Sequence, residues 1–198
     1  MPQLEELECY LRGLWLLFRG RAEGFGWLDF SERGFWRSWW AALFCVPPML
    51  LSWAAFRAMY LSMLPEGARV GSGFFASLAV IEVSGWLLPA LIIFVVSTVA
   101  GLGRYALPLV ISVNWLSVPL QWLYSIQNML QLLAPRNDEL LAFTFLAFVI
   151  CSAVAHFRIA RSILGGESLA ASAVVLAVFI GSYVAQYQLL NLLGLWPS

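Results

Sequence analysis

Five long apolar runs dominate the chain and constrain its fold more than any other feature. They cover residues 35–61, 74–100, 105–133, 140–164 and 168–193. Each can form a helix that crosses a bilayer, which takes about 20 apolar residues. The composition agrees, because 62% of the 198 residues are hydrophobic and only 11% are charged, whereas soluble domains are about a quarter charged. The sequence therefore predicts an all-α fold, a polytopic membrane bundle of about five transmembrane helices.

Short connectors join the five runs, at residues 65–73, 101–104, 135–139 and 165–167. They leave no room for a soluble domain, and they make consecutive helices antiparallel neighbours. Prolines interrupt three of the runs and predict kinks or breaks, because proline removes a backbone donor. These are Pro47, Pro48, Pro89 and Pro119.

The first 34 residues differ from the rest of the chain. Apolar side chains recur at helical spacing and form one stripe, made by Leu4, Leu7, Leu11, Leu14, Trp15 and Phe18. This stripe is too short and too charged at its edges to span a membrane. It predicts an amphipathic helix that lies in the membrane interface or docks on the bundle. Residues 1–34 are therefore expected to form a cytoplasmic helix with an aromatic, glycine-rich connector, ahead of a transmembrane domain at 35–198.

Arginine placement predicts the orientation. Five arginines precede or begin the first run, and five spans bring Arg104, Arg158 and Arg161 to that same side. Only Arg57, Arg69 and Arg136 fall on the other side. The positive-inside rule then places the N-terminus in the cytoplasm and the C-terminus in the periplasm of a bacterial inner membrane.

Glu82 is the only acidic residue well inside a run. A charged group there is costly and usually faces the bundle interior, where it is neutralised or paired. Gln121, in the third run, is expected at similar depth, so a protonated Glu82 bonded to Gln121 is the structural interpretation. A proton or cation relay is the functional one.

His156 is the only histidine, and it lies near the inner end of the fourth run. Asn114 is expected at comparable depth, so a hydrogen bond between them is one interpretation. Alternatively, His156, Arg158 and Arg161 form a site for a lipid headgroup or another anionic ligand at the cytoplasmic interface.

Small residues recur every four positions in the last two runs. Such spacing lets helix backbones approach closely in a membrane. The two small faces are therefore expected to meet, although an alanine-rich chain also produces such spacing by chance. The faces are Ala173, Ala177, Gly181 and Ala185 in the fifth run, and Ala147, Cys151 and Ala155 in the fourth.

Motifs for chemistry are missing from the sequence. One histidine excludes a bis-histidine haem site or a histidine cluster within one chain, and Cys9, Cys45 and Cys151 form no C-x-x-C pair. No Gly-rich phosphate loop and no Ser/His/Asp arrangement is present. With zero net charge and no basic groove, nucleic acid is not an expected partner. We therefore expect no enzyme activity, no metal and no cofactor.

Two stretches of the C-terminal two-thirds resemble Yip1-domain membrane proteins, especially bacterial ones. The first is Gly103-Arg104-Tyr105-Ala106-Leu107-Pro108-Leu109, where a glycine and an aromatic precede an early proline in a span. The second, residues 158–171, passes from a basic helix end through two glycines into a small-residue helix. The resemblance implies five spans and a cytoplasmic N-terminus. Eukaryotic members bind small GTPases and organise membranes, so it implies partner binding and no reaction.

The sequence thus favours a non-enzymatic membrane scaffold or accessory subunit. Its partners are expected to be the lipid bilayer and either another membrane protein or further copies of the chain. The alternative is a small transporter or channel component with a polar path at Glu82 and Gln121. A lipid-processing enzyme around His156 is a third and weaker alternative.

Overall fold

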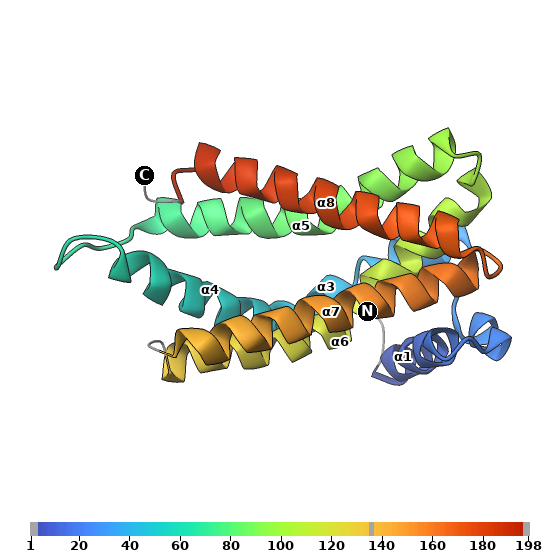
Figure 1. The fold of residues 1–198 in the computed structure, drawn as a ribbon, viewed down its shortest axis with the longest axis horizontal. Coiled ribbons are helices and arrows are strands. Elements are labelled where there is room, and N and C mark those ends of the chain that lie inside the picture. Colours follow the sequence, from blue (N-terminus) through green and yellow to red (C-terminus); the bar gives the residue numbers. More distant parts are fainter. Residues whose placement is uncertain (1–3, 135–136, 196–198) are drawn as a thin grey trace.

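The computed structural model describes residues 4–134 and 137–195, and this part of the chain is helical with short turns (Figure 1). Two short 3-10 helices, η1 (Ala22–Trp27) and η2 (Gly103–Tyr105), precede α2 and α6. The α-helices are α1 (Leu4–Phe18), α2 (Glu32–Ser38), α3 (Ala41–Phe44), α4 (Val46–Ser62), α5 (Ser72–Val99), α6 (Ala106–Leu133), α7 (Asp138–Ile163) and α8 (Ser168–Leu192).

Four helices of the described chain are long and apolar enough to cross a membrane. They are α5, the segment Gly103–Leu133 that contains α6, then α7 and α8. The chain is therefore a multi-pass membrane protein. The prolines inside α5 and α6, Pro89 and Pro119, do not end these helices, which is common in membrane helices because neighbouring groups re-satisfy the freed backbone.

The first predicted span, residues 35–61, is not one helix. It divides into α2, α3 and α4, and the axis bends by 50° where α3 meets α4. Pro47 and Pro48 occupy the first turn of α4, where a missing backbone N–H costs little because no intrahelical acceptor exists for it. The prolines thus start a new helix after the break. The described chain has a fifth span only if the bent pair counts as one, so five spans stay a prediction.

The long helices form two groups (Figure 1). In one, α5 packs antiparallel to α8; in the other, α6 packs antiparallel to α7 and runs in the same direction as α4. The groups meet at the end of the bundle that carries α1, where the main core includes Ile93, Val110, Trp115 and Ile159. At the other end, Phe74 on α5 packs against the aromatic rings of α4 and forms a smaller core.

The N-terminal helix α1 docks on the bundle, against α6 and α7. Its inward side chains Tyr10, Leu14 and Leu17 are buried, while Glu8 and Arg12 face outward. The structure thus shows α1 packed on the bundle, and a position of this helix in the membrane interface stays a prediction.

The connector η1 folds back onto α1. At the crossing, a Cβ on Gly24 would lie only 2.6 Å from the carbonyl oxygen of Gly13 and 2.9 Å from the backbone nitrogen of Leu17. Gly24 is therefore a packing position, because only a residue without a side chain allows this approach of two backbones. The crossing holds the connector beside the end of α1, where the candidate site lies.

Candidate functional site

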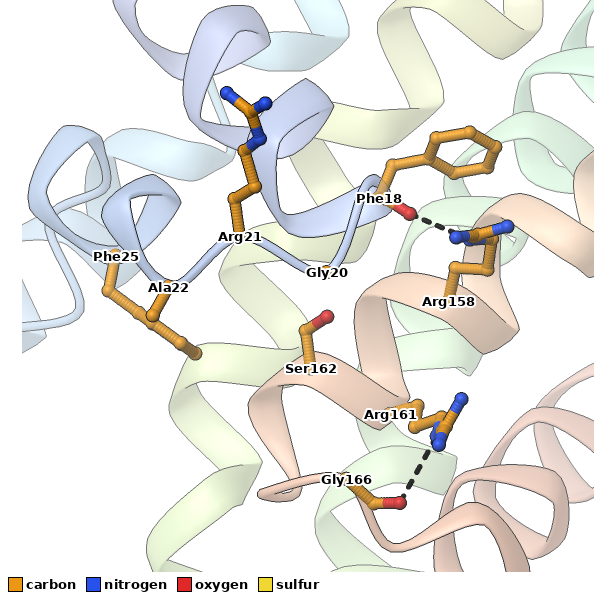
Figure 2. A pocket seen from close by; sticks show the side chains of 9 residues that line it. All are labelled: Phe18, Gly20, Arg21, Ala22, Phe25, Arg158, Arg161, Ser162 and Gly166. Carbon is orange, nitrogen blue, oxygen red and sulfur yellow. Dashed lines mark hydrogen bonds between the residues drawn. The ribbon is translucent and has the colours of Figure 1, made fainter.

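A surface hollow of about 330 Å³ lies where the end of α1, the connector and the end of α7 come together (Figure 2). Segments from opposite ends of the sequence border it. Its lining is Phe18, Gly20, Arg21, Ala22, Phe25, Arg158, Arg161, Ser162 and Gly166. Three arginines and no acidic residue take part, so the hollow is basic.

Arg158 and Arg161 lie one helical turn apart near the end of α7. The Arg158 Nε donates to the carbonyl oxygen of Phe18 at 2.7 Å, and the Arg161 Nε donates to that of Gly166 at 3.1 Å (Figure 2). Carbonyls at the end of a helix have no intrahelical donor, and the helix dipole favours cations there. Both arginines are thus held by backbone, while their Nη groups make no hydrogen bond with any described residue.

Ser162, one turn after Arg158, fastens the end of α1 to α7. Its Oγ donates to the carbonyl oxygen of Leu17 at 2.7 Å. The Arg158 guanidinium also stacks over the ring of Phe18, 5.0 Å from the centroid. The last turn of α1 therefore forms one wall of the hollow, held in place by side chains of α7.

Arg21 lines the hollow from the connector, and its guanidinium points away from those of Arg158 and Arg161 (Figure 2). All three side chains are exposed. Within residues 4–134 and 137–195 the one ion pair joins Arg37 to Glu6, so none of the three has a carboxylate partner. Glu23 and Glu167 are neighbours in sequence, but neither lies within 4.0 Å of these guanidinium groups. Three uncompensated positive charges around a hollow attract anions, and guanidinium groups match phosphate geometry.

His156 does not belong to this site. Its Nδ1–H donates to the Ser152 carbonyl oxygen at 2.8 Å, and its ring meets Phe179 of α8 edge-on, with centroids 5.3 Å apart. The structure therefore does not bring His156 together with Arg158 and Arg161, a grouping that the sequence offered as one of two alternatives. Two residues along a helix turn a side chain by about 200°, which directs His156 into the bundle and Arg158 outward.

The predicted bond between His156 and Asn114 is not formed either. Asn114 is buried and donates from Nδ2 to the Ser38 Oγ at 2.9 Å. This bond joins α6 to α2, the first piece of the broken span. Asn114 therefore has a structural role in attaching the N-terminal segment.

Glu82 lies half-buried on α5, near the indole N–H groups of Trp53 on α4 and Trp86 on its own helix. No hydrogen bond joins it to Gln121 among the described residues, so the predicted pair is not formed. Gln186 of α8 instead reaches α5, where its Nε2 donates to the Ile81 carbonyl oxygen at 3.3 Å. The polar groups here connect α4, α5 and α8 and leave out α6.

The two small-residue faces do not meet as predicted. A Cβ on Gly181 would lie 2.9 Å from the Cδ1 of Ile92, so Gly181 faces α5. Ala147 and Cys151 line a shallow apolar hollow with Leu123 of α6, so they face α6. Ala155 is buried, Ala177 and Ala185 are partly buried, and Ala173 is exposed. The small residues of α8 do allow a close approach, but the partner is α5, the helix with which α8 packs most extensively.

Sequence reasoning found Arg158 and Arg161 but missed Arg21, Phe18 and Ser162. The only signal for Arg21 is an arginine in a glycine-rich connector, where no periodicity indicates its direction. Ser162 follows Arg158 by one helical turn, and that spacing was the available clue to a shared face.

No protein-family model, curated protein or solved structure matches the chain. The resemblance to Yip1-domain proteins therefore stays a prediction.

Proposed function

We propose that this protein is a non-enzymatic membrane scaffold or accessory subunit that binds an anionic lipid headgroup at the α1 end of its bundle. One observation carries the proposal. Arg21, Arg158 and Arg161 are among the residues that line a hollow of about 330 Å³, and they have no carboxylate partner among the described residues. In a membrane protein, a basic pocket at the end of the spans is suited to anionic headgroups.

The aromatic side chains of the N-terminal segment support a headgroup-level position for the hollow. Large exposed indoles concentrate there, on Trp15, Trp27, Trp36 and Trp40. Such rings are enriched where the bilayer meets water. The hollow would then open at the depth of the lipid phosphates, and the positive-inside rule assigns that face to the cytoplasm.

The scaffold part of the proposal rests on the surfaces of the long helices. Apolar side chains of α5, α7 and α8 point outward along these helices, among them Leu91, Val95, Phe143, Leu146 and Ile180. Lipid covers such faces, and a second membrane protein or a second copy can replace that lipid. Co-purification in mild detergent tests whether a partner of fixed stoichiometry is bound.

Lipid binding by the full chain in mild detergent tests the headgroup site. Native mass spectrometry compares phosphatidylcholine alone with an equal mixture of phosphatidylglycerol and phosphatidate. We expect retained anionic lipid on the wild type and a clear loss in Arg21→Gln, which removes a charge without removing a hydrogen bond to a described residue. The matched control is Arg19→Gln, because Arg19 is exposed and lies two residues away, outside the hollow. Equal lipid retention by both variants and the wild type would contradict the headgroup site.

A further inference from the structure

We infer that a single water molecule binds between α6 and α7 in the interior of the bundle, where it accepts a hydrogen bond from the Ser112 hydroxyl and donates one to the His156 ring. This site is separate from the arginine hollow and does not depend on what binds there. The inference follows from a small cavity that both side chains line, from the unused hydroxyl of Ser112, and from the tautomer of His156.

The cavity lies where the four long apolar helices meet. Its volume is about 20 Å³, and a site needs roughly 10–15 Å³ to hold one water molecule. The volume therefore suits a single water and is too small for a lipid headgroup. Among the described residues that line the cavity, only Ser112 and His156 have polar side chains. Each of the four helices contributes apolar lining, as at Ile93, Leu109, Ile159 and Val178.

Ser112 supplies a hydroxyl without a protein partner. Its side chain is 1% exposed, and its Oγ forms no hydrogen bond with a described residue. Other hydroxyls of the long helices donate to a carbonyl of their own helix, as Thr98 does to Phe94 and Ser117 does to Val113. A buried hydroxyl without a partner is costly in apolar surroundings. A water in the cavity removes this cost.

His156 supplies an acceptor. Its Nδ1 lies 2.8 Å from the Ser152 carbonyl oxygen, and a carbonyl only accepts, so Nδ1 carries the proton. No described acidic residue lines the cavity, and a charged ring among apolar side chains would be costly, so the ring is neutral. A neutral ring with its proton on Nδ1 has a lone pair on Nε2, which no described residue uses as an acceptor.

One water satisfies both groups at once. In the part of the chain that the structure describes, no direct hydrogen bond joins Ser112 to His156. Ser112 offers a donor and the His156 Nε2 needs one, so a water between them accepts from the first and donates to the second.

Buried waters make two to four hydrogen bonds, so two polar partners are enough to hold this one. The water would join α6 to α7 by a polar link inside the main core, where the other lining side chains are apolar. It would also account for a serine at a position of α6 that is surrounded by core residues.

Solid-state NMR of the full chain in lipid bilayers tests the site. The chain has one histidine, so isotope-labelled histidine gives the spectrum of His156 alone. We expect a protonated Nδ1, an unprotonated Nε2 whose resonance is shifted to lower frequency by a hydrogen bond, and magnetisation transfer from water protons to the ring. An Nε2 resonance at the position of an unbonded ring nitrogen, or a proton on Nε2, would overturn the inference.

Ser112→Ala tests the second partner. We expect the Nε2 resonance to move to the unbonded position and the transfer from water to be lost, because one polar group does not hold the water. The matched control is Ser97→Ala, since the Ser97 Oγ is also buried without a described partner but does not line the cavity. The control should keep the wild-type spectrum, and melting temperatures above the recording temperature show that both variants are folded.

Two further outcomes would contradict the water. An unchanged His156 spectrum in Ser112→Ala would show that Ser112 is not a partner, as when its hydroxyl bonds to its own helix. A shifted Nε2 that depends on Ser112 but receives no magnetisation from water would indicate a direct bond between the two side chains. The wild-type measurement stands without either variant, so a variant that fails to fold leaves the inference testable.

Discussion

The ring of Tyr10 stacks on the indole of Trp115, with centroids 4.3 Å apart and planes inclined by 11°. Tyr10 comes from α1, and Trp115 is fully buried on α6. The contact makes α1 part of the main core. The hollow depends on this docking, because the last turn of α1 forms one of its walls.

Tyr10→Ala should detach α1. Removal of a buried aromatic side chain costs about 3–5 kcal/mol, so we expect a lower melting temperature in detergent and faster proteolysis within α1. Tyr10→Phe keeps the stack and is the matched control. An unchanged melting temperature in Tyr10→Ala would show that the stack does not hold α1.

Tyr10 should also make the fold sensitive to alkali. Burial, followed by the nearby Glu6 carboxylate, raises the pKa of Tyr10 above its ordinary value of 10.0. A raised pKa in the folded state means that the stabilising effect is complete below about pH 10 and is lost above it. The melting temperature of the wild type should therefore fall more steeply above pH 10 than that of Tyr10→Phe. Parallel curves would contradict this linkage.

Gly24→Ala should loosen the connector. The new methyl group would lie 2.6 Å from a backbone oxygen on α1, and such overpacking typically costs about 1–3 kcal/mol. Gly26→Ala is the control, because a Cβ there would meet nothing within 4 Å. We expect a lower melting temperature and weaker phosphatidate binding only in Gly24→Ala. Equal effects of the two substitutions would argue against the close crossing.

Ser162→Ala should weaken the attachment of α1 to α7. It removes the hydrogen bond to the Leu17 carbonyl oxygen, which contributes about 1 kcal/mol. Hydrogen exchange should then accelerate in the last turn of α1. Ser62→Ala serves as the comparison, since its hydroxyl bonds only within its own helix, to Met59. Unchanged exchange in Ser162→Ala would refute a role of this bond in docking.

Gly181→Leu should separate α8 from α5. The new side chain would enter the space of Ile92, because a Cβ alone would lie 2.9 Å from the Ile92 Cδ1. We expect a fall in melting temperature that Ile92→Ala partly restores in the double variant. Rescue by a substitution at Cys151 instead would favour the α7–α8 contact that the sequence predicted.

The long helices could be predicted from the sequence because apolar runs of more than 20 residues have few alternatives in a membrane protein. Which helix packs against which could not be predicted. The spacing at Gly181 indicates a face for close approach, but the same face suits any neighbouring helix. The contact of Gly181 with Ile92 depends on how the two helical groups assemble, and no local sequence pattern predicts that assembly.

The candidate site was predictable only in part. Arg158 and Arg161 stood out because arginine gathers at the ends of spans. Arg21 lies in a connector without periodicity, and only the close crossing at Gly24 brings it to the hollow. His156 was misplaced for a geometric reason, because neighbours in a helical sequence point in different directions.

The docking of α1 against α7 has a consequence for how the chain folds during its synthesis. Arg158 and Ser162 hold the last carbonyl oxygens of α1 from 140 and 145 residues later in the chain. A ribosome therefore releases α1 long before it has made the side chains that receive it. During that interval the apolar stripe of α1 has no protein surface to pack against, and the bilayer surface can shield it from water. The helix would then lie in the membrane interface first, during synthesis, and dock on the bundle later, once α7 has been made.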